Sequence, residues 1–96
     1  MNVSKTPVAP SAIPLDGPNA FAFNPPRALT IDEIHDIENR FATSAAIAKK
    51  AGFNGVEIHA AHGYLLNQFL SPHDNQRNDE YGGSLENRMR ILVELY

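Results

Sequence analysis

The sequence contains no cysteine and no surplus of positive charge. Without cysteine the chain can have no disulfide framework, no thiolate nucleophile and no cysteine-based zinc site, which fits a reducing compartment. Its 8 basic and 11 acidic side chains give a net charge of −3. This balance offers neither the basic surface expected of a nucleic-acid-binding protein nor a polybasic arm for an anionic membrane. We therefore expect small molecules or other proteins as partners, with no nucleic acid and no membrane.

Long hydrophobic runs are also missing. No run of apolar residues approaches the length that spans a membrane, and the first residues, MNVSKTP, lack the apolar core of a signal peptide. The 96 residues are 43% apolar and 20% charged, which is ordinary for one small globular domain. These features predict a cytoplasmic protein.

Proline is concentrated near the start of the chain, where six of the seven prolines lie between Pro7 and Pro26. Proline lacks a backbone donor, and the segment shows no helical periodicity, so residues 1–29 are predicted to form a loop or extended arm. The alternative interpretation is a disordered terminus.

A capping box marks the start of the first predicted helix. Thr30 and Glu33 have the required spacing, and apolar residues recur with helical spacing after them, at Ile34, Ile37, Phe41, Ala45 and Ala48. Two lysines and then Gly52 follow, as expected at the C-terminal end of a helix. We predict a helix of about five to six turns.

Residues 56–59 (VEIH) predict a short strand directly after that helix. In a strand Glu57 and His59 share one face, whereas Val56 and Ile58 share the other. A strand that follows a long helix is typical of a parallel α/β unit. A turn through His62 and Gly63 should then lead into a short apolar helix that ends before Pro72.

A long polar loop, residues 72–83, separates the short helix from a last helix capped by Ser84. We expect a structural network of ion pairs and caps to hold this loop over the last helix, built from Arg77, Asp79, Tyr81, Glu86 and Arg88. Asn67 and Gln68 are expected to satisfy backbone groups.

The number of predicted elements suggests an incomplete fold. A single parallel strand has no partner, and each buried backbone group left unpaired costs about 1–3 kcal/mol. Either the proline-rich arm supplies a second strand, or the chain is a piece of a larger α/β protein. Glu57 supports the second possibility, because a carboxylate inside a barrel needs a partner that this segment does not obviously offer.

Two long motifs carry a family resemblance: residues 59–72 (HAAHGYLLNQFLSP) and 75–88 (NQRNDEYGGSLENR). Both closely resemble the old yellow enzyme family of FMN-dependent NADH:flavin oxidoreductases, the ene-reductases. The resemblance runs from about Ala28 to Tyr96, and residues 10–14 show a weaker similarity to the same family. The chain departs from the family pattern at Asn78, where threonine is usual.

The resemblance implies a fold and a cofactor. The family fold is a (β/α)₈ TIM barrel of about 250 residues with FMN at the C-terminal mouth. By this resemblance residues 30–96 are a partial barrel domain that supplies the third helix, the fourth strand, its active-site loop and the start of the fourth helix. Family members hold FMN largely with groups from other strands, so no residue of this chain is assigned to cofactor binding. NAD(P)H is the implied reductant.

The resemblance also implies roles for three side chains. His59 and His62 match the pair that hydrogen-bonds the carbonyl or nitro oxygen of the substrate, and Tyr64 matches the usual proton donor. Two imidazole N–H groups stabilise the charge that develops on that oxygen, and a phenol can act as a general acid. The implied function is the reduction of activated C=C bonds in α,β-unsaturated carbonyl compounds.

Three other interpretations fit the same residues. A His-x-x-His pair could bind a metal with a third ligand such as His73, Asp74 or Asp79, although no metal site is predicted. Tyr64 could pack against Leu65 and Phe69. The chain could also be a truncated, non-catalytic fragment that cannot hold FMN by itself and persists by docking on a partner.

Overall fold

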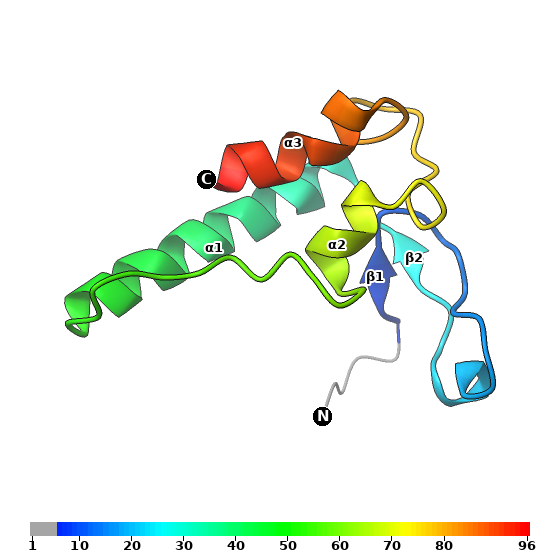
Figure 1. Cartoon of the computed structure of the whole chain (residues 1–96), viewed down its shortest axis with the longest axis horizontal. Coiled ribbons are helices and arrows are strands. Elements are labelled where there is room, and N and C mark those ends of the chain that lie inside the picture. Colours follow the sequence, from blue (N-terminus) through cyan, green and yellow to red (C-terminus); the bar gives the residue numbers. More distant parts are fainter. Residues whose placement is uncertain (1–5) are drawn as a thin grey trace.

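The computed structural model describes residues 6–96, and most of its regular structure is helical. Helix α1 (Ile31–Lys50) packs against α3 (Leu85–Leu95), and α3 packs against the short helix α2 (Leu65–Leu70). A two-stranded parallel ribbon lies beside them (Figure 1). The elements in chain order are β1 (Val8–Ala9), the 3₁₀ turn η1 (Ala20–Ala22), β2 (Arg27–Ala28), α1 (Ile31–Lys50), α2 (Leu65–Leu70) and α3 (Leu85–Leu95).

The start of α1 confirms the predicted capping box. The Thr30 hydroxyl accepts a hydrogen bond from the Glu33 N–H at 3.1 Å, and the Glu33 carboxylate accepts one from the Thr30 N–H at 2.9 Å. Arg27 also forms an ion pair with Glu33 at 2.8 Å. Hydrogen bonds from Arg27 and then from the Thr30 backbone lower the pKa of Glu33 to about 2. At the other end, Gly52 has a φ of 94°, the left-handed conformation that commonly terminates helices.

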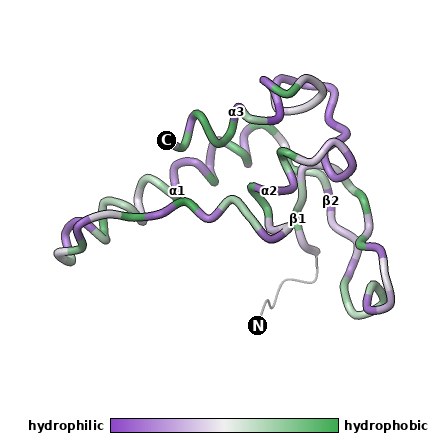
Figure 2. Tube along the Cα trace, viewed as in Figure 1, coloured by the Kyte–Doolittle hydropathy of each residue, from purple (hydrophilic) through white to green (hydrophobic). Residues whose placement is uncertain are grey.

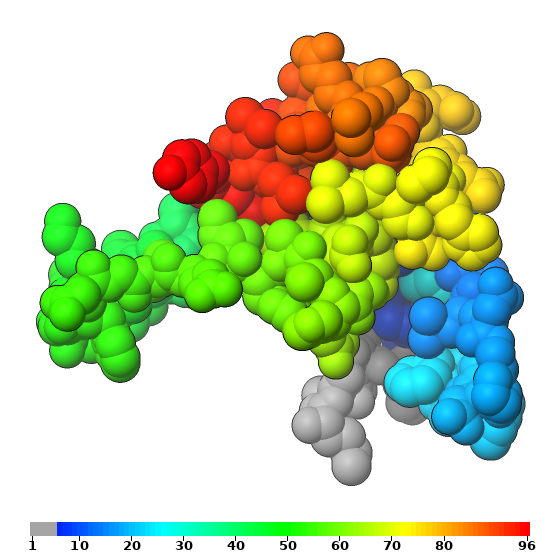
Figure 3. All heavy atoms as spheres, viewed as in Figure 1, coloured from blue at the N-terminus to red at the C-terminus, as the bar shows by residue number. Residues whose placement is uncertain are grey.

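One hydrophobic cluster joins the three helices to the arm. Its buried members come from every helix and from the segments between them: Leu29, Ile34, Leu66, Phe69, Tyr81 and Ile91. Figure 2 shows the contrast between the apolar stretches of α2 and α3 and the hydrophilic loop that connects them. The second half of α1 extends away from this cluster (Figure 3). None of the helices in residues 6–96 is long and apolar enough to cross a membrane.

The prediction of a strand at residues 56–59 is wrong for this chain. Residues 55–60 return alongside α1 in an extended path, but they belong to no strand (Figure 1). A strand is defined by its ladder of hydrogen bonds, and within residues 6–96 the backbone of this segment makes none. Val56 is 61% exposed, so the apolar side of the segment is not covered.

The proline-rich arm is partly ordered by contacts with the loop that precedes α3. Within the arm, Val8 pairs with Arg27 and Ala9 with Ala28 in a parallel register. The arm therefore pairs with itself, and it does not supply a partner for residues 56–59. Pro10 is fully buried, which argues against a disordered terminus for this part of the arm. The first part of the predicted arm, residues 1–5, lies outside the described residues.

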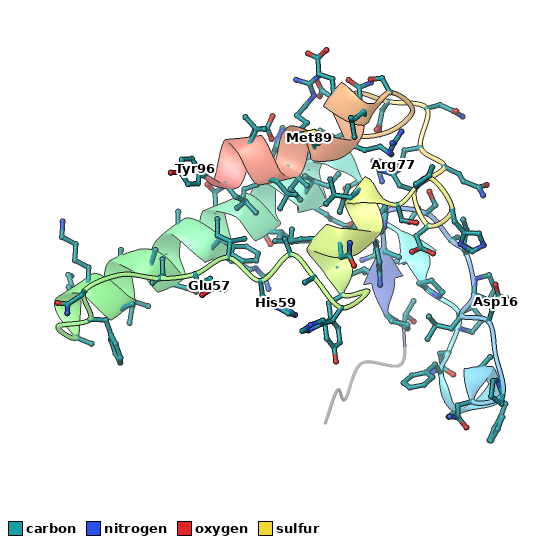
Figure 4. The ribbon with its side chains drawn as sticks, in the orientation of Figure 1. Asp16, Glu57, His59, Arg77, Met89 and Tyr96 are labelled. Atoms are coloured by element: carbon teal, nitrogen blue, oxygen red, sulfur yellow. The ribbon has the colours of Figure 1, made fainter. Side chains whose placement is uncertain are left out.

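The polar loop is held by part of the network that the sequence predicts, through Arg77, Asp79, Tyr81 and Arg88, whereas no hydrogen bond or ion pair of the Glu86 side chain is found within residues 6–96. Arg77 forms an ion pair with Asp79 at 2.6 Å and donates to the carbonyl oxygens of Pro10 and Leu29, so it connects the loop to the arm (Figure 4). Arg88 donates to the carbonyl oxygens of Leu70 and Gly83. Asn75, only 3% exposed, donates to the carbonyl oxygens of Phe69 and Tyr81 at 2.8 and 2.7 Å.

Candidate functional site

The structure brings the three predicted site residues together. The ring centroids of His59 and His62 are 5.3 Å apart, and those of His59 and Tyr64 are 5.5 Å apart. All three side chains are exposed, Tyr64 by 64%. His59 projects from the extended segment into open space in Figure 4. The three groups therefore face solvent as a cluster, and Tyr64 is not packed into the apolar core.

A left-handed turn places these rings. His62 has a φ of 59° and Gly63 a φ of 75°, so two consecutive residues adopt the left-handed conformation. Glycine adopts it freely, but for a residue with a Cβ atom it costs on the order of 1–3 kcal/mol and is most common at functional sites. Sequence reasoning found the turn through Gly63 but not the conformation of His62, because no local pattern requires it.

Two amides at the start of α2 bond to this turn. The Gly63 N–H donates to Asn67 Oδ1 at 2.8 Å, and Gln68 Nε2 donates to the Gly63 carbonyl at 3.0 Å. The expectation that Asn67 and Gln68 satisfy backbone groups is therefore confirmed.

The described residues do not themselves form a flavin pocket. A flavin mononucleotide needs a cradle of donors for its phosphate and a surface for its ring. Grooves of about 510, 390 and 320 Å³ lie along the molecule, and none of them is lined by His59, His62 or Tyr64. The three rings therefore lie outside these grooves, and no residue of this part of the chain is assigned to holding FMN.

The structure does not support a metal centre in residues 6–96. No group of three or more His, Asp or Glu side chains in this part of the chain is arranged to hold a metal ion. The proposed third ligand His73 instead contacts two carboxylates, Asp74 at 3.0 Å and Asp16 at 3.9 Å. The hydrogen bond with Asp74 raises the pKa of His73.

A second polar cluster, which sequence reasoning missed, joins α1 to α3. Glu38 and Glu94 lie within hydrogen-bonding range of each other and both line the groove of about 510 Å³. The Tyr81 hydroxyl donates to Glu94 at 2.8 Å, so His35 Nε2–H is the donor in its 3.1 Å contact with the Tyr81 oxygen. Helical periodicity alone could not find the pair, because its members come from different helices.

Burial and this pairing shift the pKa values in the cluster. Desolvation, and then the contact with Glu94, raises the pKa of Glu38 to about 7. Desolvation would also raise the pKa of Glu94, but hydrogen bonds with Glu38 and Tyr81 outweigh it and lower that pKa. Burial, reinforced by Glu94, raises the pKa of Tyr81.

Comparison with known proteins finds one matching family over nearly the whole chain. Residues 2–96 match the model described as the NADH:flavin oxidoreductase / NADH oxidase family. Flavin oxidoreductase hxnT of Emericella nidulans is 50% identical over 95 residues, which cover 95% of this chain and 24% of that protein.

Two solved structures are similar in both fold and sequence. The old yellow enzyme homologue from Zymomonas mobilis has a TM-score of 0.84, and morphinone reductase in complex with tetrahydroNAD has a TM-score of 0.86, each at 42% identity. The matches cover 94% of this chain but only 27% and 28% of those chains. The chain thus spans about a quarter of the length of the relatives it matches.

Proposed function

This chain belongs to the NADH:flavin oxidoreductase / NADH oxidase family, and we propose that it supplies the substrate-binding turn of an enzyme that reduces activated C=C bonds. The resemblance to old yellow enzymes noted in the sequence is confirmed by the matching relatives and structures. The family uses FMN, with NAD(P)H as reductant. The substrate class that we propose is α,β-unsaturated carbonyl compounds in the cytoplasm.

In this proposal residues 30–96 are one part of a (β/α)₈ barrel. α1 is the third barrel helix, the extended residues 56–59 lie at the position of the fourth strand, and α3 begins the fourth helix. The fit to family structures at 42% identity supports this assignment. In such barrels the residues that follow a strand at its C-terminal end carry the chemistry, which is where His59, His62 and Tyr64 would lie.

The convergence of three rings on one open face is the observation that carries the proposal. His59 and His62, with centroids 5.3 Å apart, are spaced to direct two N–H groups at a single substrate oxygen. Donors aimed where negative charge develops stabilise the transition state more than the ground state. FMN supplies the hydride in such enzymes. Tyr64, 5.5 Å from His59, would supply the proton to the other carbon of the double bond.

Binding of phenol, a ligand whose oxygen would take the place of the substrate oxygen, tests this assignment. Residues 30–96 would replace the matching segment of morphinone reductase, and phenol would be titrated against the oxidised, FMN-loaded hybrid. Hydrogen bonds to charged groups contribute about 1.5–3 kcal/mol, so His59→Ala with His62→Ala should weaken binding at least about tenfold. His73→Ala, a change of an exposed histidine outside the site, should leave it unaltered. Unchanged affinity in the double variant would refute the assignment.

A second candidate is that the isolated chain is a non-catalytic piece that cannot hold FMN. Two observations favour it: the site rings lie on open surface, and no described groove is lined by them. The test is to purify the chain from cells supplied with riboflavin and record its visible absorbance. We expect a colourless protein. Stoichiometric bound flavin would refute this candidate and support catalysis by the chain itself.

A further inference from the structure

We propose that Asn67 and Gln68 are positioning residues, whose two amides hold Gly63 from both sides and so keep the rings of His62 and Tyr64 beside His59. The inference rests on the proposed function, since it concerns the same turn. It goes beyond that function because it proposes that two residues of the neighbouring helix α2 fix the arrangement of the three rings.

The two side-chain amides form hydrogen bonds with the two backbone polar groups of Gly63. Asn67 accepts the Gly63 N–H at 2.8 Å, and Gln68 donates to the Gly63 carbonyl at 3.0 Å. Together these bonds fix both peptide groups that flank the Gly63 Cα atom. A rotation of either peptide would break one of the two bonds, and it would redirect His62 on one side or Tyr64 on the other.

The amides are themselves attached to the rigid part of the molecule. They lie in α2 between Leu66, which is 2% exposed, and Phe69, which is fully buried. The hydrophobic cluster therefore fixes the helix, and the helix fixes the turn. No comparable packing holds the rings, because Tyr64 is 64% exposed and both histidines are exposed.

The turn needs such a restraint because its conformation is unfavourable. His62 at a φ of 59° has a Cβ atom in the left-handed region, and Gly63 at a φ of 75° has the widest choice of other conformations. A strained residue persists only when its surroundings determine it. The hydrogen bonds with Asn67 and Gln68 are side-chain contacts that hold His62 and Gly63 in this conformation.

The chemistry of each amide predicts which replacements keep the restraint. Asn67 acts as an acceptor, so Asn67→Asp retains the bond with the Gly63 N–H and Asn67→Leu removes it. Gln68 acts as a donor, and its Oε1 is buried without a partner in residues 6–96. Gln68→Glu therefore replaces the donor by a carboxylate oxygen facing the Gly63 carbonyl.

Nuclear magnetic resonance of the isolated chain tests the restraint directly. We expect Asn67→Leu and Gln68→Glu to abolish cross-peaks between the rings of His59 and His62 and to lower the exchange protection of the Gly63 amide at least tenfold. Asn67→Asp should retain both signals. Asn39→Leu, which removes an exposed amide from α1, should also retain them. Retention of both signals in Asn67→Leu, or their loss in Asn67→Asp, would overturn the proposal.

A second measurement separates positioning from general stabilisation. In the FMN-loaded hybrid, Asn67→Leu should weaken phenol binding at least fivefold, and Asn67→Asp should bind phenol with the parental affinity. The melting temperatures of the two variants should be the same. Equal phenol binding by the two Asn67 variants would also overturn the proposal. If the double His59 and His62 variant binds phenol as tightly as the parent, the proposed function is refuted. The cross-peaks between the rings would still decide the role of Asn67 and Gln68.

Discussion

Replacing Glu38 by glutamine should remove most of the fall in the stability of this chain between about pH 5 and pH 8. Glu38 Oε1 is buried with no donor in residues 6–96, and its neighbour is the carboxyl group of Glu94. Two adjacent carboxyl groups are stable only when they share a proton. A glutamine amide at position 38 would donate to Glu94 at every pH and would imitate the protonated acid.

The direction of the pH effect follows from the raised pKa. The pKa of Glu38 is about 7 in the folded chain against an ordinary value of 4.5. Its contribution to the free energy of unfolding is fully present below about pH 4.5 and is lost as the pH rises through 7, because between these two values the unfolded state has released a proton that the folded state still holds. The lowered pKa of Glu94 acts in the other direction, but only as the pH falls below 4.5.

The magnitude is bounded by the size of the shift. At about 1.4 kcal/mol per unit, the shift of Glu38 sets an upper limit of about 3 kcal/mol, and the exposure of Glu94 to solvent lowers the expected loss to roughly 1–2 kcal/mol. In a domain of this size 1 kcal/mol moves the melting temperature by about 4–8 °C. The chain should therefore melt several degrees lower at pH 8 than at pH 5.

The assay is thermal unfolding followed by helical circular dichroism from pH 5 to 8. Other charged groups near the pair are His35, Arg90 and Glu80, and Glu57 and Arg40 line the same groove. The raised pKa of His73 contributes a loss of stability of the same sign as the pH rises, so Glu38→Gln should be repeated in a His73→Gln background. Glu57→Gln is the matched control and should keep the parental slope. A Glu38→Gln profile as steep as the parental one would refute the reasoning.

Three further changes test the packing that supports the site, each by urea unfolding. Phe69→Ala removes a fully buried ring from the cluster and should cost about 3–5 kcal/mol, unless the cluster collapses into the space. Gly82→Ala would place a Cβ atom 2.6 Å from both the Arg77 Cβ atom and its carbonyl oxygen, so we expect a loss of about 1–3 kcal/mol, whereas Gly55→Ala, with open space around it, should change little. Thr30→Ala removes the N-cap of α1 and should cost about 0.5–2 kcal/mol, and a serine at this position should retain most of the stability.

The features that the sequence predicted correctly are those encoded by neighbouring residues. Thr30 and Glu33 are three positions apart, and their reciprocal bonds need only one another, so the start of α1 was predictable. The grouping of His59, His62 and Tyr64 was predictable for the same reason, because a turn of a few residues keeps them close.

The features that were missed depend on distant residues. Residues 56–59 have the composition of a strand, but strand pairing requires a neighbour, and residues 6–96 place none there. Arg77 was expected in a local network, yet two of its partners are carbonyl oxygens of Pro10 and Leu29, far earlier in the chain. Nothing in the local sequence specifies such contacts.

The extended segment that returns along α1 also affects how this chain behaves at high concentration. The backbone donors and acceptors of residues 55–60 have no backbone partner within residues 6–96, and Val56 exposes its side chain beside them. An uncovered edge of this kind is a template for pairing with an identical edge on another copy. When the chain is produced alone, self-association through this segment should therefore set the limit on its solubility.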